Sequence, residues 1–143
     1  MANNIDTLER FIKIQKEYYE IALTEIKNGK KVSHWCWFIF PQIEGIGHST
    51  ISQYYAIKNL TEAKEYLNTP YLYDNLINIC DELLKLKSTN ILEIMGFPDN
   101  LKLCSSMTLF SIAKPDESIF NEVLEKYYNG IKDSRTLEIL GIL

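Results

Sequence analysis

The stretch Ser33–Thr50, SHWCWFIFPQIEGIGHST, contains a run with the composition of a β-strand, so the expected fold class depends on how this run is interpreted. That run is WFIF, Trp37–Phe40, and aromatic and β-branched residues favour strands. No other stretch alternates apolar and polar residues in the way that a partner strand would. We therefore predict a short aromatic helix that is capped by Ser33 and ends before Pro41, within an all-α fold.

Helical patterns extend outward from this stretch in both directions. Apolar residues recur at helical spacing from Asp6 to Asn28, and Gly29 is a natural helix stop. On the other side we predict helices over residues 49–55, 62–67 with a Thr61 cap, 71–86, 90–95, 99–112, 116–128 and 133–140. The chain contains no linker, repeat or low-complexity segment. Residues 1–143 are thus predicted to form a compact multihelical single domain.

Composition excludes several functional classes. The chain has 46% hydrophobic and 24% charged residues, a net charge of −4 and a pI of about 5.2, so we expect a soluble globule without a basic nucleic-acid-binding surface. No apolar run reaches the roughly 20 residues that span a bilayer, and the N-terminal sequence lacks the pattern of a signal peptide. We expect a cytoplasmic, monomeric protein that does not contact a membrane.

The three cysteines, Cys36, Cys80 and Cys104, are far apart and odd in number. They fit neither a disulfide framework nor a paired metal-ligand motif. We expect Cys36 and Cys80 to be buried and reduced, and no pattern in the chain predicts a metal or a cofactor.

The aromatic stretch is also the first candidate site, because it holds both tryptophans and both histidines of the chain. Indole faces beside a polar turn suit a planar ligand, which makes His34, Trp35, Trp37 and Gln42 candidate ligand-binding residues. Core packing is the alternative interpretation of the aromatic residues. The following turn could hold a phosphate through Gly47 and Ser49, and the alternative there is a tight turn with a serine cap.

The second candidate site is FPDNLKLCSSMTLF, residues 97–110. Lys102, Ser105 and Ser106 are spaced to fall on one side of a helix, where an ammonium group and two hydroxyls could contact a polar ligand. Close helix packing is the alternative explanation of the consecutive serines. No nucleophile motif occurs in the chain, and the candidates for a catalytic acid or base are His34 and Glu44.

These segments carry a resemblance to a known family. SHWCWFIFPQ, GIGHSTISQYYAI, EAKEYLNTPYL, GFPDNLKLCSSMTLF and DSRTLEIL, together spanning about Leu8 to Leu140, resemble the bacterial domain-of-unknown-function family 1810. Some members carry the label "calpastatin", although nothing here looks like a disordered protease inhibitor. The resemblance implies a compact helical domain and brings no activity. Cys36 and Cys104 depart from the family pattern, and the second departure leaves Lys102 as the only cation of its stretch.

A fainter likeness is to the NADAR group, helical proteins associated with ADP-ribose and nucleotide N-glycoside chemistry. The aromatic early segment and the Lys102–Ser105 run carry this likeness. It implies an N-glycoside hydrolase, for which Glu44 would be the acidic residue.

Two functional hypotheses follow. The first is a cleft that binds a small anionic, nucleotide-like or ADP-ribosyl molecule, with hydrolysis of an N-glycosidic bond as the reaction it would support. In that case His34, a tryptophan and Gln42 should face Lys102 and Ser105 across the cleft. The second is a non-catalytic protein-interaction module, in which these residues are dispersed. The sequence leaves open whether the protein is an enzyme.

Overall fold

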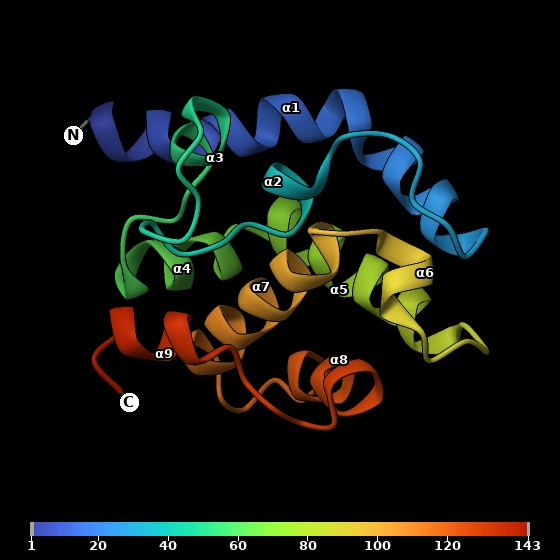
Figure 1. Ribbon diagram of the computed structural model, residues 1–143. Coiled ribbons are helices and arrows are strands. Elements are labelled where there is room, and N and C mark those ends of the chain that lie inside the picture. Colours follow the sequence, from blue (N-terminus) through green and yellow to red (C-terminus); the bar gives the residue numbers. More distant parts are fainter. Residues whose placement is uncertain (1, 143) are drawn as a thin grey trace.

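The computed structural model describes residues 2–142, with side chains from residue 8 onward. This part of the chain folds into nine helices without a β-sheet, as predicted (Figure 1). The helices are α1 Ala2–Lys27, α2 Cys36–Ile39, α3 Thr50–Tyr54, α4 Leu60–Leu67, α5 Pro70–Lys85, α6 Ile91–Met95, α7 Asp99–Ala113, α8 Ile119–Tyr128 and α9 Ser134–Ile139. The WFIF run therefore lies in a helix and the loop that follows it.

Helix α7 is the centre of the fold. It contacts α2, α4, α6, α8 and α9, and it crosses the middle of the molecule in Figure 1. Apolar and small residues lie all around α7 after its first turn, where Leu103 and every residue from Ser105 to Ser111 are buried. A helix without a polar face must be enclosed by its neighbours, which explains why the other helices surround α7.

Aromatic rings connect the layers of the core. Phe11 of α1 packs edge-on against Tyr66 of α4, with ring centroids 5.2 Å apart. Tyr66 in turn lies 5.2 Å from Phe110 of α7, and Phe110 lies 5.7 Å from Phe120 of α8. All four rings are fully buried. Burial of each such side chain stabilises the fold by roughly 1.5–3 kcal/mol, so these rings fix α1, α4, α7 and α8 to one core.

Four helices, α1, α2, α4 and α8, start two or more residues away from their predicted starts. Helix α1 begins at Ala2 rather than Asp6. Helix α4 begins two residues earlier than expected, because Asn59 rather than Thr61 caps it by accepting a hydrogen bond from the Glu62 amide at 2.9 Å. Helix α8 begins at Ile119, since the residues after Pro115 form a turn in which the Glu117 amide bonds to the Lys114 carbonyl.

Helix α2 also starts later than predicted, because the Ser33 side chain is engaged elsewhere. Its hydroxyl donates to Oε2 of Glu25 at 2.6 Å and does not cap α2. Oε1 of Glu25 accepts hydrogen bonds from the Val32 amide, the Ser33 amide and the Trp35 indole at 2.8–2.9 Å. One carboxylate of α1 thus holds the chain that leads into α2 and directs Trp35 into the core.

The cysteines lie where the sequence predicted. Cys36 and Cys80 are buried, Cys104 is partly buried, and all three are free. Burial raises the pKa of the Cys36 and Cys80 thiols, and it raises that of Cys104 to about 11. In the part of the chain that the structure describes, no helix has the length and apolar character needed to cross a bilayer.

The Glu25 contacts make a prediction about stability and pH. Burial disfavours the charged form, but the bonds from Ser33, Val32 and Trp35 outweigh it and lower the pKa of Glu25 from 4.5 to about 2. The carboxylate therefore stabilises the fold fully above pH 4.5, and this contribution is lost as the pH falls from 4.5 toward 2. We expect Glu25→Gln to lower the free energy of unfolding at pH 7 by about 1–3 kcal/mol, because charged hydrogen bonds are lost.

Urea unfolding at neutral pH and at pH 3 measures this effect. The difference between wild type and Glu25→Gln should shrink at the lower pH. Glu17→Gln, an exposed position on the same helix, is the matched control and should change little. An equal loss for Glu25→Gln at both pH values would contradict the assignment.

Candidate functional site

A cleft of about 510 Å³ lies between the loop after α2, the start of α7 and the start of α9. This volume falls within the range of small-molecule sites. Thirteen residues line the cleft: Trp37, Gln42, Ile46, Gly47, His48, Ser49, Ser52, Pro98, Leu101, Lys102, Ser105, Asp133 and Arg135. The structure thus brings together six of the residues predicted from the sequence, which come from α2, the loop and glycine turn that follow it, and α7.

Two backbone hydrogen bonds close the base of the loop between α2 and α3. The Ile57 amide donates to the Gln42 carbonyl at 2.8 Å, and the Glu44 amide donates to the Ile57 carbonyl at 2.7 Å. These bonds form a parallel bridge between Ile43 and Ile57. The bridge fixes the backbone of Gln42, whose side chain lines the cleft.

In the loop between α2 and α3, Gly47 lies against the Ser52 side chain and leaves no space for a side chain of its own. A Cβ atom on Gly47 would lie 2.5 Å from Oγ and 2.6 Å from Cβ of Ser52. Ser49 caps α3, because its hydroxyl accepts a hydrogen bond from the Ser52 amide at 3.2 Å. The two hydroxyls, Ser49 Oγ and Ser52 Oγ, lie 2.8 Å apart. The serine-cap alternative from the sequence is therefore what this turn contains.

The opposite wall is formed by Lys102 and Trp37. Nζ of Lys102 lies 4.5 Å from the centroid of the Trp37 ring, which is a cation–π contact. The same ammonium lies 3.3 Å from Oδ1 of Asp99, one turn earlier on α7. Lys102 remains partly exposed, with 21% of its side chain accessible. The ammonium group is therefore held against the indole at the edge of the cleft.

Ser105 joins α7 to α9 through a carboxylate. Its hydroxyl donates to Oδ2 of Asp133 at 3.1 Å. The same oxygen caps α9, accepting hydrogen bonds from the Thr136 amide and hydroxyl at 3.0 and 2.6 Å. The Asp133 amide donates to the Thr108 hydroxyl at 2.8 Å. These contacts fix the start of α9 in the cleft wall. Oδ2 of Asp133 accepts three of the hydrogen bonds.

The lining carries a net positive charge in a chain that is negative overall. Lys102 and Arg135 supply two cations and Asp133 supplies one carboxylate, while the chain has a net charge of −4. Arg135 lies 3.0 Å from Glu138, but both side chains are more than half exposed, and such surface pairs are weak. Two cations and one carboxylate thus line the cleft, and the Asp99 carboxylate lies beside Lys102 outside the lining.

The family model described as "Protein of unknown function (DUF1810)" matches residues 5–140. The chain belongs to the DUF1810 family. A crystal structure of the conserved hypothetical protein Rv1873 from Mycobacterium tuberculosis is similar, with a TM-score of 0.92 and 40% sequence identity over 95% of this chain and 97% of that one. A comparison with curated proteins finds no match.

Four predicted site residues of this DUF1810 protein lie outside the cleft. Trp35 is fully buried and bonds to Glu25, which turns its ring into the core. His34, which precedes it, is exposed. Glu44 is also exposed, and only its backbone joins the Ile57 bridge. The expected convergence of His34 with Lys102 on one cleft is therefore not what the structure shows.

Ser106 is the fourth residue outside the cleft. It is fully buried, and its hydroxyl has no hydrogen-bond partner among the described residues. Of the two consecutive serines, Ser105 faces the cleft and Ser106 packs inside the helical core. The packing interpretation is confirmed for Ser106, and ligand binding by Ser105 stays a prediction.

Several lining residues were missed by sequence reasoning. Asp133 and Arg135 lie in the DSRTLEIL segment, whose sequence carries a family resemblance but no site prediction. His48 and Ser52 belong to the glycine turn and the helix that follows it, while Pro98 and Leu101 flank Asp99. No periodic signal connects α9 to this site, because its contact with α7 is made through tertiary hydrogen bonds. Among the described residues, no cluster of His, Cys, Asp or Glu could hold a metal ion.

The close approach at Gly47 generates a prediction. Gly47→Ala should displace the first turn of α3, because the added methyl would overlap Ser52. We expect faster amide hydrogen exchange in α3 and little change in the exchange of α7. Adding Ser52→Gly to this variant removes both overlapping atoms and should restore much of the protection. Unchanged exchange in Gly47→Ala alone would show that the loop does not need this contact.

Proposed function

We propose that the cleft binds a small molecule that combines a planar ring with an anionic group, as nucleotides do. The observation that carries the proposal is the pairing of Trp37 with Lys102, 4.5 Å from ring centroid to ammonium, at the wall of one cleft. An aromatic surface beside a fixed cation offers complementary contacts to the two parts of such a molecule.

Different residues of the cleft would contact the ring and the anionic group of this ligand. The accessible part of the Trp37 indole would contact the ring. Lys102 and Arg135 are the lining cations for the anionic group, and an ammonium or guanidinium bonded to phosphate makes strong, charge-assisted contacts. Gln42 and Ser105 supply amide and hydroxyl groups for the remaining polar atoms. ADP-ribose is a larger member of the same chemical class.

Hydrolysis of an N-glycosidic bond stays a hypothesis outside this proposal. Such a reaction requires a positioned acid or base, and His34 and Glu44 lie outside the cleft. Asp133 and His48 are the carboxylate and imidazole in the lining. One oxygen of Asp133 already accepts three hydrogen bonds, and His48 is exposed on the loop. We therefore propose binding without a chemical step.

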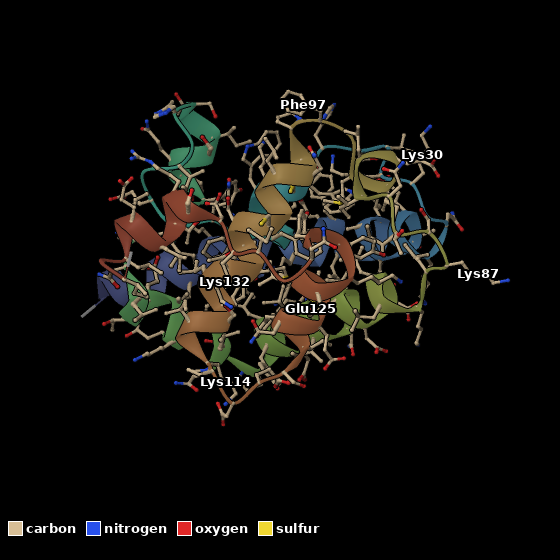
Figure 2. The ribbon with its side chains drawn as sticks, turned by 60° about the horizontal axis from the view of Figure 1, so that its bottom comes forward. Lys30, Lys87, Phe97, Lys114, Glu125 and Lys132 are labelled. Carbon is tan, nitrogen blue, oxygen red and sulfur yellow. The ribbon has the colours of Figure 1, made fainter. Side chains whose placement is uncertain are left out.

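One observation favours the protein-interaction alternative. Phe97, two residues before α7, is 75% exposed, and Leu101, which lines the cleft, is 53% exposed. Figure 2 shows Phe97 projecting from the edge of the molecule at this end of the helix. Exposed apolar residues of this size are common at binding surfaces, so the test must separate a small ligand from a protein partner.

Titration with AMP, adenosine and inorganic phosphate tests the proposal. Trp35 is buried and Trp37 lines the cleft, so a change in tryptophan emission that disappears in Trp37→Phe reports binding at this site. AMP should bind more tightly than adenosine or phosphate alone. At one hundred times its dissociation constant, it should stabilise the protein by about 2.7 kcal/mol, which thermal melting detects.

Lys102→Met should weaken AMP binding by about tenfold, since one charge-assisted hydrogen bond is worth at least about 1.5 kcal/mol. It should leave adenosine binding unchanged. Lys87→Met is the matched control, because Lys87 is exposed and projects away from the molecule in Figure 2. Equal binding of AMP and adenosine, or no binding of either, would contradict the proposal and favour the interaction module.

A further inference from the structure

Three charged side chains form a line that ends at the cleft. Oδ2 of Asp99 lies 2.7 Å from Nζ of Lys31, and Oδ1 of Asp99 lies 3.3 Å from Nζ of Lys102. Lys102 lines the cleft, whereas Asp99 and Lys31 do not. The Lys31 side chain is only 6% exposed. In Figure 2, Lys30 and Phe97 mark the edge where the segment after α1 meets the start of α7.

The two lysines differ in how their ammonium groups are used. Lys31 donates to Asp99 and to the Ser33 carbonyl at 2.6 Å, and it lies 5.1 Å from the Trp35 ring centroid. Lys102 has Asp99 and the Trp37 ring as neighbours. Because an ammonium carries three donors, Lys102 keeps hydrogen-bonding capacity for a group in the cleft. Lys31 is already surrounded by the protein.

We propose that Asp99 is a positioning residue for anion binding, holding the Lys102 ammonium over Trp37 so that its remaining donors face the cleft. This inference rests on the part of the proposed function that makes Lys102 the anion-binding group. A free lysine samples many rotamers, and an anion that binds it must order them. In this protein the Asp99 contact orders the lysine before the anion arrives.

The positive charge of Lys31 offsets the negative charge of Asp99. A carboxylate beside Lys102 would by itself repel an incoming anion. Lys31 is closer to Asp99 than Lys102 is, and its positive charge offsets that repulsion. The three side chains together carry one net positive charge, which leaves the cleft attractive to an anion although Asp99 is ionised. Asp99 can thus position Lys102 without cancelling its charge at the cleft.

The double variant Lys31→Met/Asp99→Asn tests positioning apart from charge. It removes one positive and one negative charge, so the net charge of the group is unchanged. The probe is inorganic phosphate, followed through the NMR signal of the Trp37 indole N–H, which Trp37→Phe identifies. We expect the dissociation constant for phosphate to rise about fivefold or more, because binding must now order Lys102 itself. The signal of Trp37 in the free protein should also shift as the ammonium leaves the ring.

Lys85→Met/Asp81→Asn is the matched control. It makes the same chemical changes at an exposed pair, 3.3 Å apart on α5 and outside the lining of the cleft. It should leave phosphate binding and the Trp37 signal unchanged. Should the cleft variant fail to fold, Asp99→Ser and Asp99→Glu provide the second comparison. Phosphate binding should weaken with serine and be retained with glutamate, which can still reach Lys102.

The outcomes separate this inference from the proposed function. Unchanged phosphate binding and an unchanged Trp37 signal in the cleft variant would overturn the positioning role, even if AMP binds the wild type. A wild type whose Trp37 signal does not respond to phosphate would also overturn it. Phosphate binding that weakens only in the cleft variant would support the inference, even if a nucleotide ring adds no affinity and the proposed function fails.

Discussion

The structure depends on the Glu25 carboxylate, which collects four hydrogen-bond donors from the segment between α1 and α2. Two are backbone amides, one is a hydroxyl and one is the Trp35 indole. An indole N–H inside a core must find an acceptor, because an unpaired buried donor is costly. Glu25 meets this requirement and at the same time turns the chain from the end of α1 into the molecule. The long first helix thereby sets where the aromatic segment enters the core.

The orientation of α2 follows from this constraint. With Trp35 turned inward, Trp37 lies two residues further around the helix and lines the cleft, while Phe38 and Phe40 are buried. Gln15 of α1 donates to the Phe38 carbonyl at 2.7 Å and holds the far end of α2. Adjacent positions in one aromatic run therefore have different roles. The core and the cleft wall share a single short helix.

Helix α7, on the other side of the cleft, also contributes residues both to the core and to the cleft wall. Its enclosed half packs against the surrounding helices, and its first turns present Lys102 and Ser105 to the cleft. Ser106 lies in the enclosed part of α7 and is fully buried. Ser105 instead bonds to Asp133 and so links α7 to the start of α9. The cleft thus exists because a buried central helix has one end near the surface.

Sequence patterns alone predict the all-α fold, most helix positions and six of the residues that line the cleft. Helical periodicity, caps such as Ser49 and Asn90, and stops such as Gly96 are local signals, and local hydrogen bonds enforce them. Those patterns do not predict which tryptophan lines the cleft, that His34 and Glu44 lie outside it, or that Asp133 and Arg135 line it. Those choices depend on contacts between residues far apart in the chain, such as Glu25 with Trp35's indole and Ser105 with Asp133. Spacing within one helix gives the face of a side chain but not the helix that will cover it.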